Sequence, residues 1–133
     1  MSERSGYRGY VASRDVRGQR WPQHVQNVVI RDYCAREKLP YLLSVAEYAM
    51  EGCYMNLSTV LDELPRIEGI AMFSLFMLPQ RPERRQAVYE RVLGAGASLH
   101  GALEGTGLTS AADIARIEDT FALEGITQRA AGF

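Results

Sequence analysis

The run of residues 68–80 constrains the fold more than any other part of this chain. It reads Glu-Gly-Ile-Ala-Met-Phe-Ser-Leu-Phe-Met-Leu-Pro-Gln, and eight of the ten residues from 70 to 79 are apolar. A strand with one face in water alternates apolar and polar residues, whereas a short continuous apolar run is typical of a strand buried on both faces. We therefore expect residues 70–76 to form the central strand of a parallel sheet.

The rest of the chain alternates between strand and helix patterns around this run. Short apolar stretches predict further strands at 7–13, 41–46 and 97–103. Apolar residues at helical spacing predict helices at 22–38, 56–64, 82–93 and 110–123. This order predicts an α/β fold with three layers, in which a doubly wound, four-stranded parallel sheet of order 2-1-3-4 lies between helices, as in flavodoxin-like proteins.

Length and composition indicate one domain over residues 1–133, with loose tails at 1–5 and 127–133. The charges nearly cancel, with 15 basic and 16 acidic residues, which makes nucleic acid an unexpected partner. Apolar runs are too short to span a bilayer, and the polar start lacks a signal peptide, so we expect a cytoplasmic protein without a membrane partner. Cys34 and Cys53 are expected to be reduced thiols.

Ligands of open α/β sheets bind beyond the carboxyl ends of the strands, where the strand order reverses. That point lies between the first and third strands of the predicted sheet. We therefore expect a site built from residues 13–21 and 74–81, with walls from 47–48 and 100–104. The chain contains no glycine-rich phosphate loop, HxH or HExxH pattern, so neither a cofactor nor a metal is expected.

Several side chains at these strand ends carry chemistry. The carboxylates Glu47 and Glu104 are candidates for general acid and base, or else are simply exposed. Guanidinium groups near a helix N-terminus favour an anion, and Arg81, Arg84 and Arg85 in the first turns of a helix also indicate an anionic partner or a solvated face. The candidate catalytic residues are Glu47, Glu104 and Ser13, and the candidate substrate-binding residues are Arg14, Arg17, Gln19, Tyr48, Ser74 and His100.

Two stretches resemble the catalytic domain of serine recombinases (resolvases). Gly9-Tyr10-Val11-Ala12-Ser13, followed by Gln19 and a helix, matches the strand that ends in that family's nucleophilic serine. The family's third strand runs into a Leu-Asp-Arg-Leu motif, where this chain has Leu75-Phe76-Met77-Leu78. The resemblance implies a resolvase-like fold without recombinase activity, because the acid and the arginine are replaced.

A longer resemblance, over most of the chain, is to the sporadic carbohydrate cluster proteins. It implies a place in gene clusters that make unusual carbohydrates. The strings that carry it are 6–11 (GYRGYV), 22–27 (PQHVQN), 30–34 (IRDYC), 46–50 (AEYAM), 52–54 (GCY), 61–65 (LDELP) and 74–79 (SLFMLP).

Together these observations favour a small cytoplasmic enzyme of unusual-carbohydrate biosynthesis. Its substrate would be an activated or phosphorylated sugar, and its chemistry that of an acid–base isomerase or lyase without a metal. The alternatives are a non-catalytic ligand-binding or scaffolding module for a carbohydrate enzyme, and a hydrolase that cleaves the N-glycosidic bond of a nucleotide. A homodimer through the last helix is also expected, because Phe121, Leu123 and Ile126 lie late in a chain already supplied with core.

Overall fold

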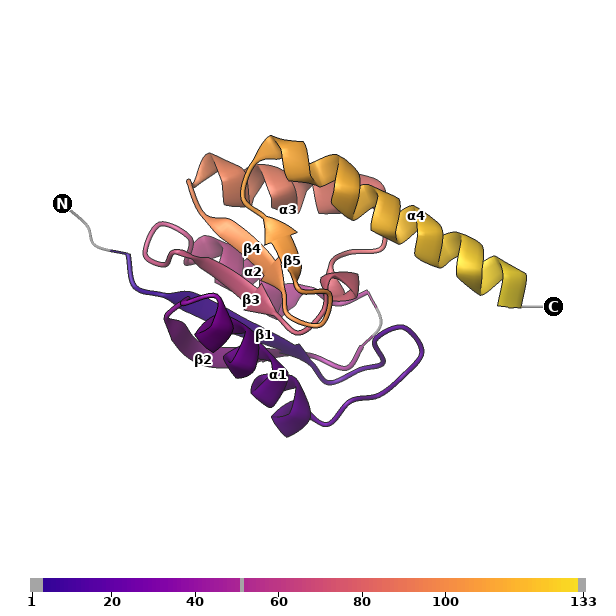
Figure 1. The fold of residues 1–133 in the computed structure, drawn as a ribbon, viewed down its shortest axis with the longest axis horizontal. Helices are drawn as coiled ribbons and strands as arrows, with labels where there is room; N and C mark the ends of the chain where they lie inside the picture. Colours follow the sequence, from indigo (N-terminus) through magenta and orange to yellow (C-terminus); the bar gives the residue numbers. More distant parts are fainter. Residues whose placement is uncertain (1–3, 51, 132–133) are drawn as a thin grey trace.

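The structure, a computed structural model, describes residues 4–50 and 52–131, with side chains up to residue 125. Helices cover both faces of one sheet (Figure 1). The elements in chain order are β1 (Tyr7–Ala12), α1 (Gln23–Arg36), β2 (Tyr41–Glu47), α2 (Met55–Asp62), β3 (Gly69–Met72), the 3-10 turn η1 (Leu75–Met77), α3 (Pro82–Gly94), β4 (Ser98–Gly101), β5 (Thr106–Leu108), the 3-10 turn η2 (Ala111–Asp113) and α4 (Ile114–Ala131).

The sheet has five strands in the order β2-β1-β3-β4-β5. Neighbours among the first four are parallel, whereas β5 runs antiparallel to β4. The predicted sheet of four parallel strands is therefore wrong. Where the sequence predicts a single strand at 97–103, residues 98–108 form a hairpin, because the chain reverses at 102–105, where Gly105 has a φ of 69°. A three-residue strand such as β5 is too short to show a sequence period.

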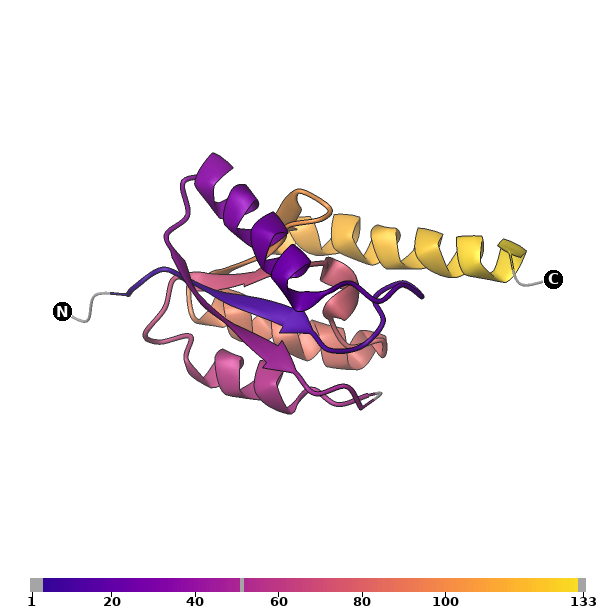
Figure 2. The same cartoon turned by 90° about the horizontal axis from the view of Figure 1, so that it is seen from below.

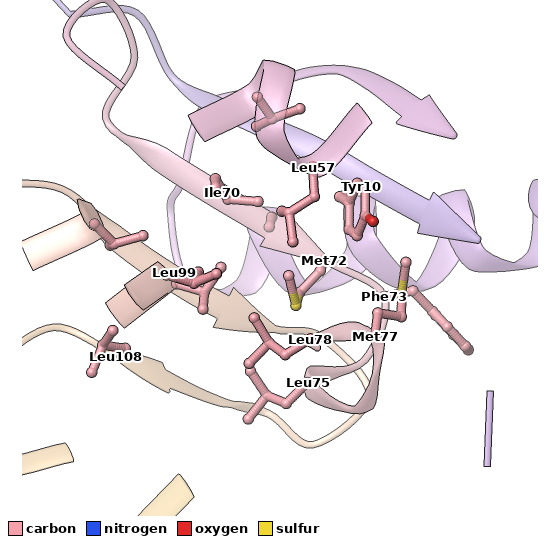
Figure 3. Packing of buried hydrophobic residues seen from close by; sticks show 14 of the residues in the cluster. Tyr10, Leu57, Ile70, Met72, Phe73, Leu75, Met77, Leu78, Leu99 and Leu108 are labelled. Carbon is pink, nitrogen blue, oxygen red and sulfur yellow. The ribbon is translucent and has the colours of Figure 1, made fainter. Parts of the chain in front are cut away.

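The central strand β3 is shorter than the apolar run that predicts it. Only Gly69–Met72 pair as a strand, and all four residues are buried. From residue 74 the chain leaves the sheet, because the Ser74 hydroxyl accepts a hydrogen bond from the Phe76 N–H and starts η1. Phe73, Leu75, Met77 and Leu78 stay buried and pack in one cluster with Ile70 and Met72 (Figure 3), whereas Phe76 is partly buried. The predicted strand at 70–76 is too long because an apolar run indicates burial, whereas strand pairing ends at residue 72.

The helices sit in two layers, with α1 on one face of the sheet and α2 and α3 on the other (Figure 2). At the β5 edge, α4 packs against α3. Arg85 of α3 makes two 2.8 Å hydrogen bonds with the Glu118 carboxylate, and the Tyr89 hydroxyl donates to the same group at 2.6 Å. Arg85 is thus buried, not solvated on the helix surface. The last turns of α4 run past the sheet in both views.

Both chain ends differ from the predicted loose tails. The Ser5 N–H donates to the Arg66 carbonyl, and the Arg4 side chain donates to the carbonyls of Ala95 and Gly96. Helix α4 continues to Ala131 because a single glycine, Gly125, lowers helix stability by only about 1 kcal/mol and does not end a helix. The remaining tail residues, 1–3 and 132–133, lie outside the described residues. None of the described helices is long and apolar enough to cross a membrane.

Candidate functional site

A cavity of about 470 Å³ opens where β1 and β3 end. Its wall comes from four separate parts of the chain. Ala12 ends β1 and residues 14–18 follow it, residues 76, 77, 80, 81 and 84 follow β3 and enter α3, residues 52 and 54 precede α2, and residues 121, 124 and 125 belong to α4. The volume is within the range usual for small-molecule sites.

A tight turn after β1 forms one lip of the cavity. The backbones of Val16 and Gln19 exchange two hydrogen bonds of 2.7 and 3.1 Å. The two residues between them, Arg17 and Gly18, have φ values of 53° and 78°, as in a type I′ turn. Buried Val16 anchors this turn to the core, so that the Arg17 side chain reaches the Glu124 carboxylate on α4 at 2.8 Å.

Arg14 is held in place by backbone carbonyls. Its Nη1 donates to the carbonyls of Met50 and Cys53 at 2.9 and 2.8 Å. The same guanidinium lies 4.8 Å from the centre of the Tyr54 ring, an attractive cation–π distance. The charge of Arg14 therefore stays at the cavity wall, and no carboxylate of the described residues pairs with it.

Arg81 and Arg84 contribute from the start of α3. The Arg84 guanidinium lies 5.0 Å from the Tyr54 ring centre, and no described carboxylate lies within ion-pair distance of it. Arg81 makes a long 3.7 Å contact with Glu83, and both side chains are exposed. In all, four arginines and two carboxylates line the cavity. The excess of positive charge, next to a helix N-terminus, favours an anionic ligand.

Glu47 lies at the end of β2 but does not line this cavity. Its side chain is 1% exposed, and its carboxylate accepts hydrogen bonds from the Tyr10 hydroxyl and from the N–H groups of Asn56 and Leu57, at 2.8 to 3.0 Å. Burial raises its pKa, but the hydrogen bonds outweigh burial and hold the pKa of Glu47 below its ordinary value. The group therefore caps α2 as a carboxylate, which argues against general acid catalysis.

Glu104 and Ser74 form a second internal contact. The Ser74 hydroxyl donates to Glu104 at 2.7 Å, and the Leu75 N–H donates to the same carboxylate at 2.8 Å. Ser74 is fully buried. Glu104 thus ties the β4–β5 turn to η1, and neither residue lines the cavity. The acid–base pair expected from the strand ends is not assembled.

The other sequence candidates lie apart from one another. The Ser13 hydroxyl accepts from the Gln23 side chain at 2.7 Å, just outside the cavity lining. Gln19 lines a smaller neighbouring hollow, and Tyr48 is exposed. His100 lies on β4, where its ring nitrogens contact Tyr33 and Ser98 at 2.8 and 3.0 Å and burial lowers its pKa. Of the nine predicted site residues, only Arg14 and Arg17 line the cavity.

Phe121 and Glu124 of α4 line the cavity, although the sequence patterns did not predict them as site residues. The switch-point rule places strand ends at a site, but it says nothing of a last helix that folds back over them. The Phe121 ring lies 5.0 Å from the Phe76 ring, which brings α4 to the cavity edge. In the part of the chain that the structure describes, no three His, Cys, Asp or Glu side chains converge as a metal site would require.

No family model matches the chain. No curated protein matches it either. Among solved structures it is similar to a resolvase family site-specific recombinase from Streptococcus pneumoniae, with a TM-score of 0.64, 9% identity, and coverage of 95% of this chain and 93% of that one. It is also similar to the N-terminal catalytic domain of TP901-1 integrase, with a TM-score of 0.59, 9% identity, and coverage of 95% and 99%. At this identity the likeness concerns the fold alone, and the fold of this chain is resolvase-like.

Proposed function

We propose that this protein binds a phosphorylated sugar in the arginine-lined cavity, as a ligand-binding protein of carbohydrate biosynthesis. One observation carries the proposal. The guanidinium groups of Arg14 and Arg84 lie 4.8 and 5.0 Å from the centre of the same Tyr54 ring. Neither guanidinium pairs with a carboxylate among the described residues, so an anion bound beside the Tyr54 ring would be attracted by two positive charges within about 10 Å of each other.

A phosphate group suits this arrangement. Guanidinium groups bind phosphate oxygens through paired hydrogen bonds, and such charge-assisted bonds are the stronger kind. The apolar faces of Phe76 and Phe121 at the same cavity supply surface on which a sugar ring stacks. We choose a sugar derivative because of the sequence strings that resemble sporadic carbohydrate cluster proteins, although no family model matches the chain, and we place the protein in the cytoplasm with such metabolites.

A second candidate is the isomerase or lyase. The observation that favours it is Asp15, a carboxylate that lines the cavity on the same loop as Arg14 and Arg17. Its side chain is 58% exposed and lies 3.4 Å from Arg20, so it is available to take a proton from a bound sugar. In this second proposal Asp15 is the acid–base group, in place of Glu47 and Glu104.

Calorimetry with fructose 6-phosphate and with neutral fructose tests the binding. We expect the phosphate ester alone to bind, and the Arg84→Gln variant to bind it roughly 10-fold more weakly, a loss of about 1.4 kcal/mol. Arg84 suits the test because its described contact is with the Tyr54 ring. Arg36→Gln is the matched control, since Arg36 pairs with Asp32 on the exposed side of α1. Equal binding of fructose, or an unchanged Arg84→Gln variant, would contradict the proposal.

The second candidate needs a separate measurement. NMR spectra of the bound sugar phosphate would be followed over hours with wild type and with Asp15→Asn. Conversion by wild type that is lost in Asp15→Asn supports the enzyme. Binding without conversion leaves the ligand-binding function and removes the enzymatic one for that sugar.

A further inference from the structure

We propose that the Arg17 guanidinium is a second anion subsite of this cavity, which the chain itself fills with the Glu124 carboxylate. The ligand would then carry two anionic groups, one at Arg14 and Arg84 and one at Arg17. This inference rests on the proposed binding of a phosphorylated sugar and adds a second charged group to that ligand.

The backbone at Arg17 gives the first reason. The residue has a φ of 53°, a left-handed conformation that is unfavourable for a residue with a β-carbon. Asparagine and glycine are usual at this position of a type I′ turn. An arginine there brings no evident benefit to the turn itself. Residues with such a backbone conformation gather at ligand-binding sites, and this one carries a guanidinium that lines the cavity.

The surroundings of Arg17 give the second reason. The guanidinium lies 5.0 Å from the Phe76 ring centre and 2.8 Å from the Glu124 carboxylate. Its side chain is 46% exposed, so a ligand can reach it. The Glu124 side chain is 16% exposed, and ion pairs within reach of solvent contribute little to stability, whereas a phosphate brings more charge and more acceptor oxygens than a carboxylate. A phosphate group can therefore replace Glu124 at little cost.

The third reason is that the fold does not need this ion pair. Six residues earlier on α4, Glu118 binds Arg85 through two hydrogen bonds and accepts a third from Tyr89. The Arg85 side chain is 5% exposed and also stacks 3.9 Å from the Phe121 ring centre. These buried contacts fix α4 against α3. Displacing Glu124 from Arg17 thus leaves the helix in place and frees the subsite.

Fructose 1,6-bisphosphate and fructose 6-phosphate form the probe pair, because they differ by one phosphate. Binding would be measured by calorimetry at fixed ionic strength. We expect wild type to prefer the bisphosphate, and Arg17→Gln to lose most of that preference, because its affinity falls more for the bisphosphate than for the monophosphate. Glu124→Gln should bind the bisphosphate about 3- to 10-fold more tightly, because the competing carboxylate is gone.

Asp62→Asn is the charge-matched control, since Asp62 pairs with Arg91 and does not line the cavity. The same tightening in this variant would overturn the subsite, because it would show an effect of net charge alone. Equal affinity for both sugars in wild type and in Glu124→Gln would also overturn it, yet leave the proposed binding function standing. If neither sugar phosphate binds to wild type or to Glu124→Gln, both proposals fail.

Discussion

Two groups of charged side chains lie near the carboxyl ends of the strands, and they differ in whether the fold uses their charge. The carboxylates of Glu47 and Glu104 accept hydrogen bonds from backbone N–H groups and side-chain hydroxyls. The arginines instead reach a cavity, and Arg84 has no described carboxylate partner. A charge at a strand end is therefore not itself evidence of a site. A charged side chain is available to a ligand only where backbone groups nearby do not already satisfy it through hydrogen bonds.

The sign of the charge explains the difference. The first turns of α2 and η1 present N–H groups without an intrahelical partner, and a nearby carboxylate satisfies them. Arginine only donates hydrogen bonds, so a helix N-terminus offers it nothing. Arg14 is intermediate between the two groups, because loop carbonyls bind its Nη1 and the residue also lines the cavity. Substitutions at both groups separate structural carboxylates from arginines that are available to a ligand.

The largest effect is expected for Glu47→Ala. The substitution leaves the Tyr10 hydroxyl and two N–H groups of α2 buried without an acceptor, and each such group costs about 1–3 kcal/mol. We expect the free energy of unfolding to fall by roughly 3–5 kcal/mol, measured by urea denaturation. The exposed Glu83→Ala should change it by less than about 0.5 kcal/mol. A loss below 1 kcal/mol for Glu47→Ala would mean that the carboxylate is not a structural cap.

The contact between Ser74 and Glu104 should be worth less, because it involves fewer buried donors. Ser74→Ala removes a hydroxyl that donates to Glu104 and accepts from Phe76, so we expect a loss of about 1–2 kcal/mol. Ser74→Ala and Glu104→Ala combined should be less destabilising than the sum of the two, with a coupling of about 0.5–2 kcal/mol. Additive effects in this double-mutant cycle would contradict a direct structural link between η1 and the β4–β5 turn.

The sequence predicted the fold better than the site. The apolar run after Gly69 and the alternation of strand and helix patterns are strong signals. Burial on both faces of a strand produces a continuous apolar run, and packing of one helix face produces apolar residues at helical spacing. The three-residue strand β5 has no such pattern. The error over residues 73–76 has a related cause, since an apolar run records burial but not the partner of each backbone hydrogen bond.

The structure places Arg14 and Arg17 of the predicted site residues at the cavity beyond the strand ends, whereas the other seven do not line it. Whether Glu47 points into a cavity or onto the N-terminus of α2 depends on where α2 begins, and element boundaries are poorly encoded in local pattern. Glu124 lies over a hundred residues from Arg17, and their approach depends on how α4 docks. Neither residue type nor spacing in the sequence predicts the contact between Arg17 and Glu124.

A smaller effect should appear in the pH dependence of stability. Burial lowers the pKa of His100 in the folded state, so the unfolded chain binds this proton more readily, at its ordinary pKa of about 6.5. The contribution of neutral His100 is present above that pH and is lost as the pH falls towards the folded-state value. Between pH 7 and 5, His100→Gln should show a shallower loss than wild type, by at most about 1.4 kcal/mol per pH unit. Parallel pH profiles in urea denaturation would contradict the prediction. The stabilising contribution of the Glu47 carboxylate is lost at lower pH, as the pH falls below the ordinary pKa of this group towards its lowered folded-state pKa.

The smallest effect is expected at Arg17, where two substitutions separate backbone strain from charge. Arg17→Asn and Arg17→Ala both remove the ion pair with Glu124, but only asparagine tolerates the positive φ of this turn. Arg17→Asn should therefore be the more stable of the two by about 0.5–1 kcal/mol, and close to wild type, because a partly exposed ion pair contributes little. Thermal unfolding measures the difference. Equal stability of the two variants would show that the turn relaxes at no cost, and it would weaken the case that an unfavourable backbone conformation is kept at Arg17 for a ligand. A stable Arg17→Asn variant that no longer distinguishes fructose 1,6-bisphosphate from fructose 6-phosphate would show that the ligand needs the guanidinium and the fold does not.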